Sequence, residues 1–139
     1  MEEVTSRSQE TMVNVLIVGD NRPLVGLWAR SLRRAGARVA LADTPETAAD
    51  LLADRRFDIL ILDIGPEPGC ALSVADMAQY RQPEARIIFV TSSSFFSDGS
   101  IFTLCANACA CVPSGTAPED LAHMAAHYAR PSPPGARTG

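Results

Sequence analysis

Five short apolar runs alternate with amphipathic segments along the chain. Each run is nearly free of polar residues, which is typical of strands buried on both faces of a sheet. Between the runs, apolar residues recur at the three- and four-residue spacing of amphipathic helices. This alternation predicts an α/β domain with a parallel sheet covered by helices on both faces. The predicted strands cover residues 13–18, 38–42, 59–62, 86–90 and 108–112.

Five helices are expected between and after these strands. Gly36 is a stop signal at the end of the first helix. Thr44 and Pro45 give the second helix a hydroxyl N-cap followed by proline at its first position. Thr116 and Glu119 have the spacing of a capping box at the start of the last helix. The predicted helices cover residues 23–35, 45–55, 70–81, 98–105 and 117–129.

The 139 residues are enough for one domain, which we place at residues 13–129. Residues 1–12 are polar and are expected to be a flexible lead-in, and the Pro/Gly-rich residues 130–139 are expected to be disordered. The N-terminal segment has no apolar signal region and no run could span a bilayer, so a cytoplasmic protein with reduced cysteines is expected.

Charge narrows the function classes further. The net charge is −4, which gives no reason to expect a nucleic-acid or membrane partner. All twelve basic residues are arginine, and the chain contains no lysine.

Polar side chains mark the ends of three predicted strands. Asp63 follows the aliphatic run 59–62, and it is expected at the carboxyl end of that strand because a buried unpaired charge is costly. Asp20 follows the first strand and Thr91 follows the fourth. Ligands bind at this edge of an open α/β sheet. Two carboxylates and a hydroxyl there suit a magnesium–phosphoryl site, because magnesium takes hard oxygen ligands and a carboxylate can accept a phosphoryl group.

These motifs, in this order, resemble the response-regulator receiver domain over residues 13–129. Val-Leu-Ile-Val-Gly-Asp-Asn at 15–21 resembles the first strand with its acidic pair, and Asp-Ile-Leu-Ile-Leu-Asp at 58–63 resembles the phosphoacceptor strand. The resemblance implies a flavodoxin-like, doubly wound three-layer α/β/α fold. It also implies Asp63 as phosphoacceptor, Thr91 as the switch hydroxyl, and Mg²⁺ held by Asp20, Asp63 and Gly65.

The chain departs from the receiver pattern at several positions. Gly19 stands where the family has the first acid of the pair, and Val112 stands where it has a lysine. Cys109 replaces the usual switch aromatic, and the loop after Asp63 is shorter by two residues. These changes indicate an atypical or degenerate receiver in which Mg²⁺ binding is weak or absent.

Simpler roles stand beside these assignments. Asp63 could be a strand-end acid bonded to loop amides, Asp20 a turn or capping residue, and Thr91 a hydroxyl that satisfies backbone groups. Arg22 could supply part of the missing lysine's charge. Three arginines on the first predicted helix form either a solvated face or a docking patch for a partner: Arg30, Arg33 and Arg34. His123 and His127 on the last predicted helix are expected on a solvated face.

Three cysteines close together also invite a metal interpretation. Cys109 and Cys111 are expected to share a strand face, and Cys105 precedes them closely. Their spacing is not the Cys-x-x-Cys of zinc sites, so small core residues are the favoured interpretation.

The leading functional hypothesis is a stand-alone, non-enzymatic receiver-like module of a two-component or phosphorelay system that acts through protein–protein interaction. Its expected partner is a histidine kinase or another signalling protein, or a second copy bound through the face of the fourth helix, fifth strand and fifth helix. One alternative is a response regulator phosphorylated on Asp63 by a histidine kinase. Another is a small flavodoxin-like cofactor-binding protein or enzyme, although the turn after the first strand is acidic and poor in hydroxyls.

Overall fold

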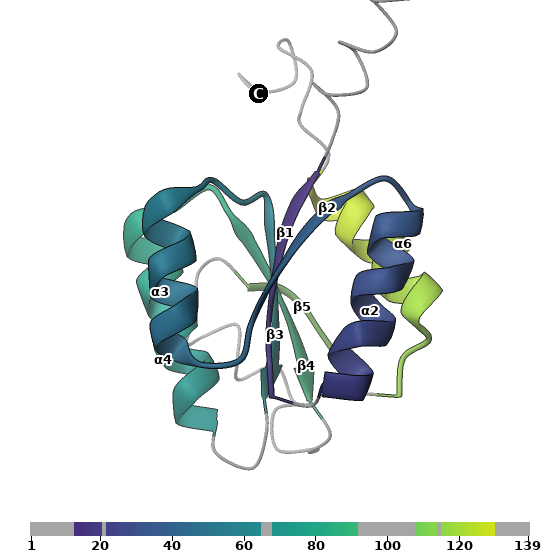
Figure 1. The fold of residues 1–139 in the computed structure, drawn as a ribbon, viewed down its shortest axis with the longest axis horizontal. Coiled ribbons are helices and arrows are strands. Elements are labelled where there is room, and N and C mark those ends of the chain that lie inside the picture. The colour runs from purple at the N-terminus through teal and green to yellow at the C-terminus, as the bar shows by residue number, and fades with distance from the viewer. Residues whose placement is uncertain (1–12, 21, 65–67, 92–107, 114, 130–139) are drawn as a thin grey trace, which may run out of the picture.

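The computed structural model describes residues 13–20, 22–64, 68–91, 108–113 and 115–129. Within these ranges, strands and helices alternate as the sequence predicts (Figure 1). The elements are β1 (Asn14–Val18), α2 (Arg22–Arg34), β2 (Arg38–Ala42), α3 (Pro45–Asp54), β3 (Ile59–Ile64), α4 (Pro68–Arg81), β4 (Arg86–Thr91), β5 (Ala108–Pro113) and α6 (Pro118–Ala129).

The five strands form one parallel sheet in the order β2-β1-β3-β4-β5. β3 is the central strand, and Ile59–Leu62 are fully buried in it. A continuous apolar run suits a strand covered on both faces, whereas a half-exposed strand would alternate. The order reverses between β1 and β3. In open α/β sheets, ligands bind beyond the carboxyl ends of the strands at such a point.

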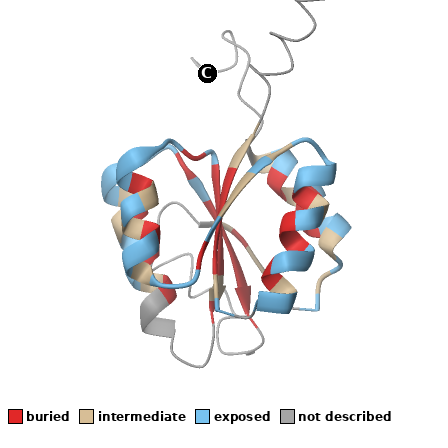
Figure 2. Ribbon diagram, in the orientation of Figure 1, coloured by how far each residue is buried: buried red, intermediate tan, exposed pale blue. Residues whose placement is uncertain are grey.

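Helices cover the sheet on both faces. α2 and α6 lie on one face and α3 and α4 on the other, with buried residues along the strands and the inner helix surfaces (Figure 2). Alternate strand residues therefore enter two apolar clusters. The α2/α6 cluster includes Trp28, Leu32 and Leu121, and the α3/α4 cluster includes Leu52 and Val74.

The bounds of the predicted elements differ from those in the structure by no more than two residues, for the elements that the structure describes. The Thr44 hydroxyl accepts a hydrogen bond from the Thr47 N–H at 3.1 Å, which confirms the N-cap of α3. Gly36 has a φ of +100°, the left-handed conformation expected after a helix end. Four of the five predicted helices are present in the described part of the chain. The fifth, at 98–105, lies outside it, as do the two terminal segments 1–12 and 130–139.

β5 contains an irregularity that the strand pattern did not reveal. Ile87 pairs with Ala108 while Ile88 pairs with Ala110, so Cys109 is an extra residue at a bulge. The expectation that Cys109 and Cys111 share a face is therefore wrong, because the bulge reverses the alternation between them. Cys109 packs against the α2/α6 cluster and Cys111 against the α3/α4 cluster.

Among the residues that the structure describes, no helix combines the length and the apolar character needed to cross a bilayer.

Candidate functional site

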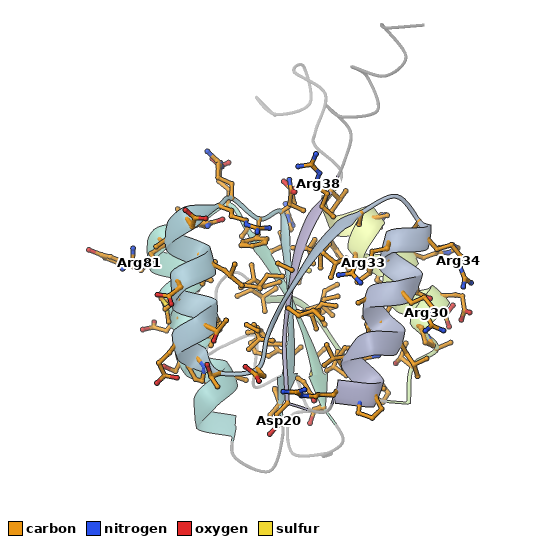
Figure 3. The ribbon with its side chains drawn as sticks, viewed as in Figure 1. Asp20, Arg30, Arg33, Arg34, Arg38 and Arg81 are labelled. Carbon is orange, nitrogen blue, oxygen red and sulfur yellow. The ribbon has the colours of Figure 1, made fainter. Side chains whose placement is uncertain are left out.

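Four polar side chains from four strands meet the same edge of the sheet, which we call the carboxyl edge. Asp63 is the penultimate residue of β3, and Thr91 ends β4. Asp20, which Figure 3 labels, lies just beyond β1. Sequence reasoning missed a third acid, Asp43, which directly follows β2. The rule that identified Asp20 and Asp63 would have found it, since Asp43 also comes directly after an apolar strand. Gly65 lies outside the described residues.

The carboxyl group of Asp63 is held in an unfavourable place for a charge. It is half-buried, and its position in the strand alternation directs it to the face that packs on α2 and α6. Partial burial raises its pKa above the ordinary value of 3.8, and the negative charge of Asp20 raises it further. The Coulombic effect means that the two acids predicted to act together do lie near each other.

Gly19 packs directly against Asp63. A Cβ built on Gly19 would lie 2.9 Å from the Cβ of Asp63 and 3.2 Å from the Cγ2 of Val25 on α2. The Gly19 N–H donates to the carbonyl of Ala42 at 3.0 Å, which ties this position to β2. The departure from the acidic pair is therefore accompanied by tight packing, and a side chain here requires the neighbours to move.

The position of the missing lysine is also defined by the strand register. Asp63 pairs with Val90 on β4, and Val90 pairs with Val112 on β5. Val90 and Val112 belong to or pack on the α2/α6 cluster, the face to which Asp63 also points. Neighbouring strands are about 4.8 Å apart, so the backbone of Val112 is about 10 Å from that of Asp63. A lysine side chain and the Asp63 side chain would bridge this distance together, whereas a valine side chain is too short to do so. The row from Gly19 through Asp63 and Val90 to Val112 contains no cation.

Arg22, the first residue of α2, pairs with Asp43. Its Nη2 lies 3.7 Å from Asp43 Oδ2, and the two side chains are 85% and 51% exposed. Such an exposed pair contributes little to stability. In this structure, the charge suggested as a replacement for lysine is thus directed to Asp43.

The other candidate residues have separate environments. Thr91 is buried at the end of β4 and pairs with Ile64 and Pro113. Burial raises the pKa of the half-buried Cys109 thiol to about 11, although the charge of Arg86 opposes the shift. Cys109 is therefore a packed, protonated thiol at neutral pH.

No metal cluster of the cysteine–histidine kind is present in the described ranges. His123 and His127 are exposed on α6, and Cys105 falls outside those ranges. Among the described residues, no group of three or more His, Cys, Asp or Glu side chains could hold a metal ion. Arg30, Arg33 and Arg34 are exposed on α2.

Comparisons with known proteins concern the fold of the chain and its likeness to signalling proteins. No family model matches the chain. The photosynthetic apparatus regulatory protein RegA of Rhodobacter capsulatus is 27% identical over 78 residues, which are 56% of this chain and 42% of RegA. RegA of Rhodovulum sulfidophilum is 26% identical over 78 residues. The matches thus span less than half the length of these curated relatives.

Solved structures of receiver domains have the same fold. A CheY-like receiver domain protein from Methanospirillum hungatei JF-1 superposes with a TM-score of 0.74 at 23% identity, covering 85% of this chain and 94% of that one. The response regulator TrrA of Thermotoga maritima, solved with Mg²⁺ and BeF, gives 0.71 at 23% identity, covering 84% and 99%. A Burkholderia pseudomallei response regulator with a phosphorylated aspartic acid and a calcium ion gives 0.69 at 24%, covering 78% and 64%. The chain has the receiver-domain fold.

Proposed function

We propose that this receiver-fold chain is a signalling module of a two-component or phosphorelay system, and that it binds its partner protein with Asp63 unmodified. In this proposal it acts in the cytoplasm by protein–protein interaction and has no enzymatic activity of its own. The receiver fold and the similarity to the RegA regulators support the two-component assignment.

The observation that supports partner binding by unmodified Asp63 is the row of residues from Gly19 through Asp63 and Val90 to Val112, which contains no cation. A phosphoryl group on Asp63 brings about two negative charges at neutral pH. These charges would add to the negative charge of the neighbouring Asp20 carboxylate. Val112 occupies the position from which a lysine would reach the phosphoryl group. A ligand or modification shifts a conformational equilibrium only by its differential affinity for the two states. Thr91 keeps its hydroxyl, but with valine at 112 and cysteine at 109 the chain lacks the lysine and the aromatic ring through which a phosphoryl group would favour another state.

Among the residues that the structure describes, Mg²⁺ would have an incomplete set of ligands, and the predicted ligand Gly65 lies outside them. The carboxylates of Asp20 and Asp63 are close enough to repel each other and would be its protein ligands. Gly19 adds no carboxylate, and its packing leaves no room for one. Bound Mg²⁺ would neutralise the two acids and supply positive charge beside a phosphoryl oxygen. We therefore expect weak binding, with most of the coordination left to water.

The partner-binding surface in this proposal is the face formed by β5 and α6, to which the sequence analysis adds the helix predicted at 98–105, outside the described residues. On α6, the exposed side chains His123 and His127 lie away from the core residues Leu121 and Ala125. A signalling protein such as a histidine kinase would bind this face, or a second copy of the chain would do so.

A second candidate function is that of a phosphate-accepting response regulator. Asp63 remains at the phosphoacceptor position beside Asp20, and a solved structure of the same fold carries a phosphorylated aspartic acid. In that case a small phosphodonor with Mg²⁺ would add about 80 Da, one phosphoryl group, to the intact mass. Asp63→Asn would not gain this mass.

The test compares two variants in cells that lack the natural copy. Under the proposal, Asp63→Ala restores the phenotype that the deletion removes, whereas the surface variant His123→Glu/His127→Glu does not. Immunoblots establish equal abundance, and circular dichroism of the purified variants establishes folding. Loss of output with Asp63→Ala, together with full output from the surface variant, would show that phosphotransfer is the function.

A further inference from the structure

The arginines are distributed unevenly between the two ends of the sheet. Because the helices run antiparallel to the strands, the ends of α2 and α4 meet the beginnings of the strands at one edge, which we call the arginine edge. Figure 3 labels Arg33, Arg34, Arg38 and Arg81, which come from these ends, and Asp20 at the opposite edge. The arginine edge consists of Arg33, Arg34, Arg38, Arg55, Arg56, Arg81 and Arg86.

The acids are concentrated at the opposite, carboxyl edge. The arginine edge has three acids close to its arginines in the sequence: Asp54, Asp58 and Glu84. Among the residues that the structure describes, the carboxyl edge has one arginine, Arg22, and six acids, which lie at strand ends and in the first turns of helices. These are Asp20, Asp43, Glu46, Asp63, Glu119 and Asp120. A chain of net charge −4 therefore presents one basic end and one strongly acidic end.

Hydrogen bonds hold the arginine edge in a fixed arrangement. The side chain of Gln82 joins the ends of α3 and α4, because its Nε2 donates to the carbonyls of Leu52 at 2.8 Å and Arg55 at 2.6 Å. The backbone N–H groups of Arg38 and Arg86 donate to Val13 O at 2.8 Å and Asp58 O at 3.0 Å. The positions of these arginines are thus set by the frame of the domain.

The side chains themselves face water. All seven arginines of the edge are exposed. One of them, Arg33, donates from Nη2 to the carbonyl of Val39 at 3.3 Å. Tyr80, which precedes Arg81 at the end of α4, is 87% exposed, a high value for an aromatic residue. Arginine and tyrosine are the residues enriched at the centres of protein–protein interfaces.

Local stability explains part of this arrangement. Cations near a helix C-terminus interact favourably with the helix dipole, which accounts for Arg33, Arg34 and Arg81. The helix dipole does not account for Arg38, Arg56 or Arg86, which begin or precede strands.

We propose that the arginine edge binds an acidic surface of a different protein, one that presents aspartate and glutamate carboxylates. The planar guanidinium group matches a carboxylate in two parallel hydrogen bonds, and arginine loses less freedom than lysine when it does so. The three acids among the arginines repel a continuous polyanion such as nucleic acid, but they leave room for separate carboxylates. The edge lies opposite Asp63, and none of its arginines belongs to β5 or α6. This surface is therefore additional to the one under the proposed function and does not depend on it.

The probe is a glutamate-rich amphipathic helical peptide with one tyrosine, titrated at low salt into the ¹⁵N-labelled full chain. Backbone shift changes are expected at the arginine edge and absent around Asp20 and Asp63. Arg55→Gln/Arg56→Gln/Arg81→Gln should bind the peptide at least about tenfold more weakly. Arg22→Gln removes one arginine from the other edge and should bind like the natural chain. Thermal unfolding of each variant separates lost binding from lost folding.

Three results would overturn the proposal. Shift changes at the carboxyl edge, or equal weakening in both variants, would show non-specific charge attraction. Tighter binding of a double-stranded DNA oligonucleotide than of the peptide, under the same salt, would assign the edge to nucleic acid. Concentration-dependent dimers that the triple variant abolishes would mean that the acidic end of a second copy occupies the edge.

Discussion

Two aspartates at opposite ends of β3 differ in what surrounds them. Asp58, just before the strand, is fixed to β1: its Oδ2 accepts from the Asn14 N–H at 2.9 Å, and its own N–H donates to Asn14 O at 2.8 Å. Asp63, near the end of the strand, is half-buried beside Asp20, and both effects raise its pKa. One acid supports the fold, whereas the other opposes it.

The same contrast holds for the edges as wholes. At the arginine edge, side-chain and backbone hydrogen bonds join the ends of helices to the beginnings of strands. At the carboxyl edge, a half-buried acid lies beside a like charge, and an exposed ion pair spans 3.7 Å. Unfavourable charges of this kind concentrate at functional sites, because a site for a ligand is not optimised for stability. The difference predicts opposite effects of removing a charged or hydrogen-bonding side chain: a loss of stability at the arginine edge, and no loss or a gain at Asp63.

The largest effect is expected from Gln82→Ala at the arginine edge. The side chain accepts from the Phe57 N–H at 2.8 Å and donates to two carbonyls, so its removal leaves three backbone groups without this partner. Part-buried groups left unsatisfied cost about 1–3 kcal/mol, and we expect a loss of about 3 kcal/mol in the free energy of unfolding. Urea denaturation measures it. Ser73→Ala, at an exposed position of α4, the helix that ends just before Gln82, is the control and should change stability by less than about 0.5 kcal/mol. If Gln82→Ala is equally mild, hydrogen bonding does not hold this edge.

The next effect tests packing at the carboxyl edge. Gly19→Ala places a Cβ where the Cβ of Asp63 lies 2.9 Å away, so strand β1 or β3 must shift. Overpacking of this kind costs about 1–3 kcal/mol. Gly19→Asp should cost more, because it adds a third negative charge next to Asp20 and Asp63.

A magnesium titration of the same variants sharpens the result. Followed by backbone NMR shifts near Asp20 and Asp63, it should show that Gly19→Asp does not produce tight binding. Gly26→Ala, where a Cβ would meet no heavy atom within 4 Å, is the steric control and should not lower stability. Micromolar magnesium affinity in Gly19→Asp would show that the strands adjust easily and that only the missing carboxylate weakens the site.

The sequence predicted the parts of this molecule that depend on periodicity. Continuous runs such as Ile59–Leu62 gave the strands, and a hydroxyl cap at Thr44 gave the start of α3, because these signals are local. The same rule placed Asp20 and Asp63 at one edge. The bulge at Cys109, the close contact between Gly19 and Asp63, and the Gln82 hydrogen bonds join residues far apart in the chain or depend on strand register. No local pattern encodes them.

The smallest effect compares the two aspartates directly. Asp58→Ala removes the acceptor of the Asn14 N–H and should lower the free energy of unfolding by about 1 kcal/mol. Asp63→Asn should leave it unchanged or raise it, by less than about 1 kcal/mol, since water screens a half-exposed carboxylate. The raised pKa fixes the pH dependence of the second effect. Folded Asp63 holds its proton to higher pH than unfolded Asp63, so its ionisation lowers stability as the pH rises above 3.8 through the raised value. Urea denaturation from pH 3 to pH 7 should therefore give equal stabilities for the natural chain and Asp63→Asn at the acid end, and an advantage for Asp63→Asn at neutral pH. A clear loss of stability in Asp63→Asn at neutral pH would mean that the carboxylate accepts hydrogen bonds that hold the edge together, and the contrast between the two ends of β3 would disappear.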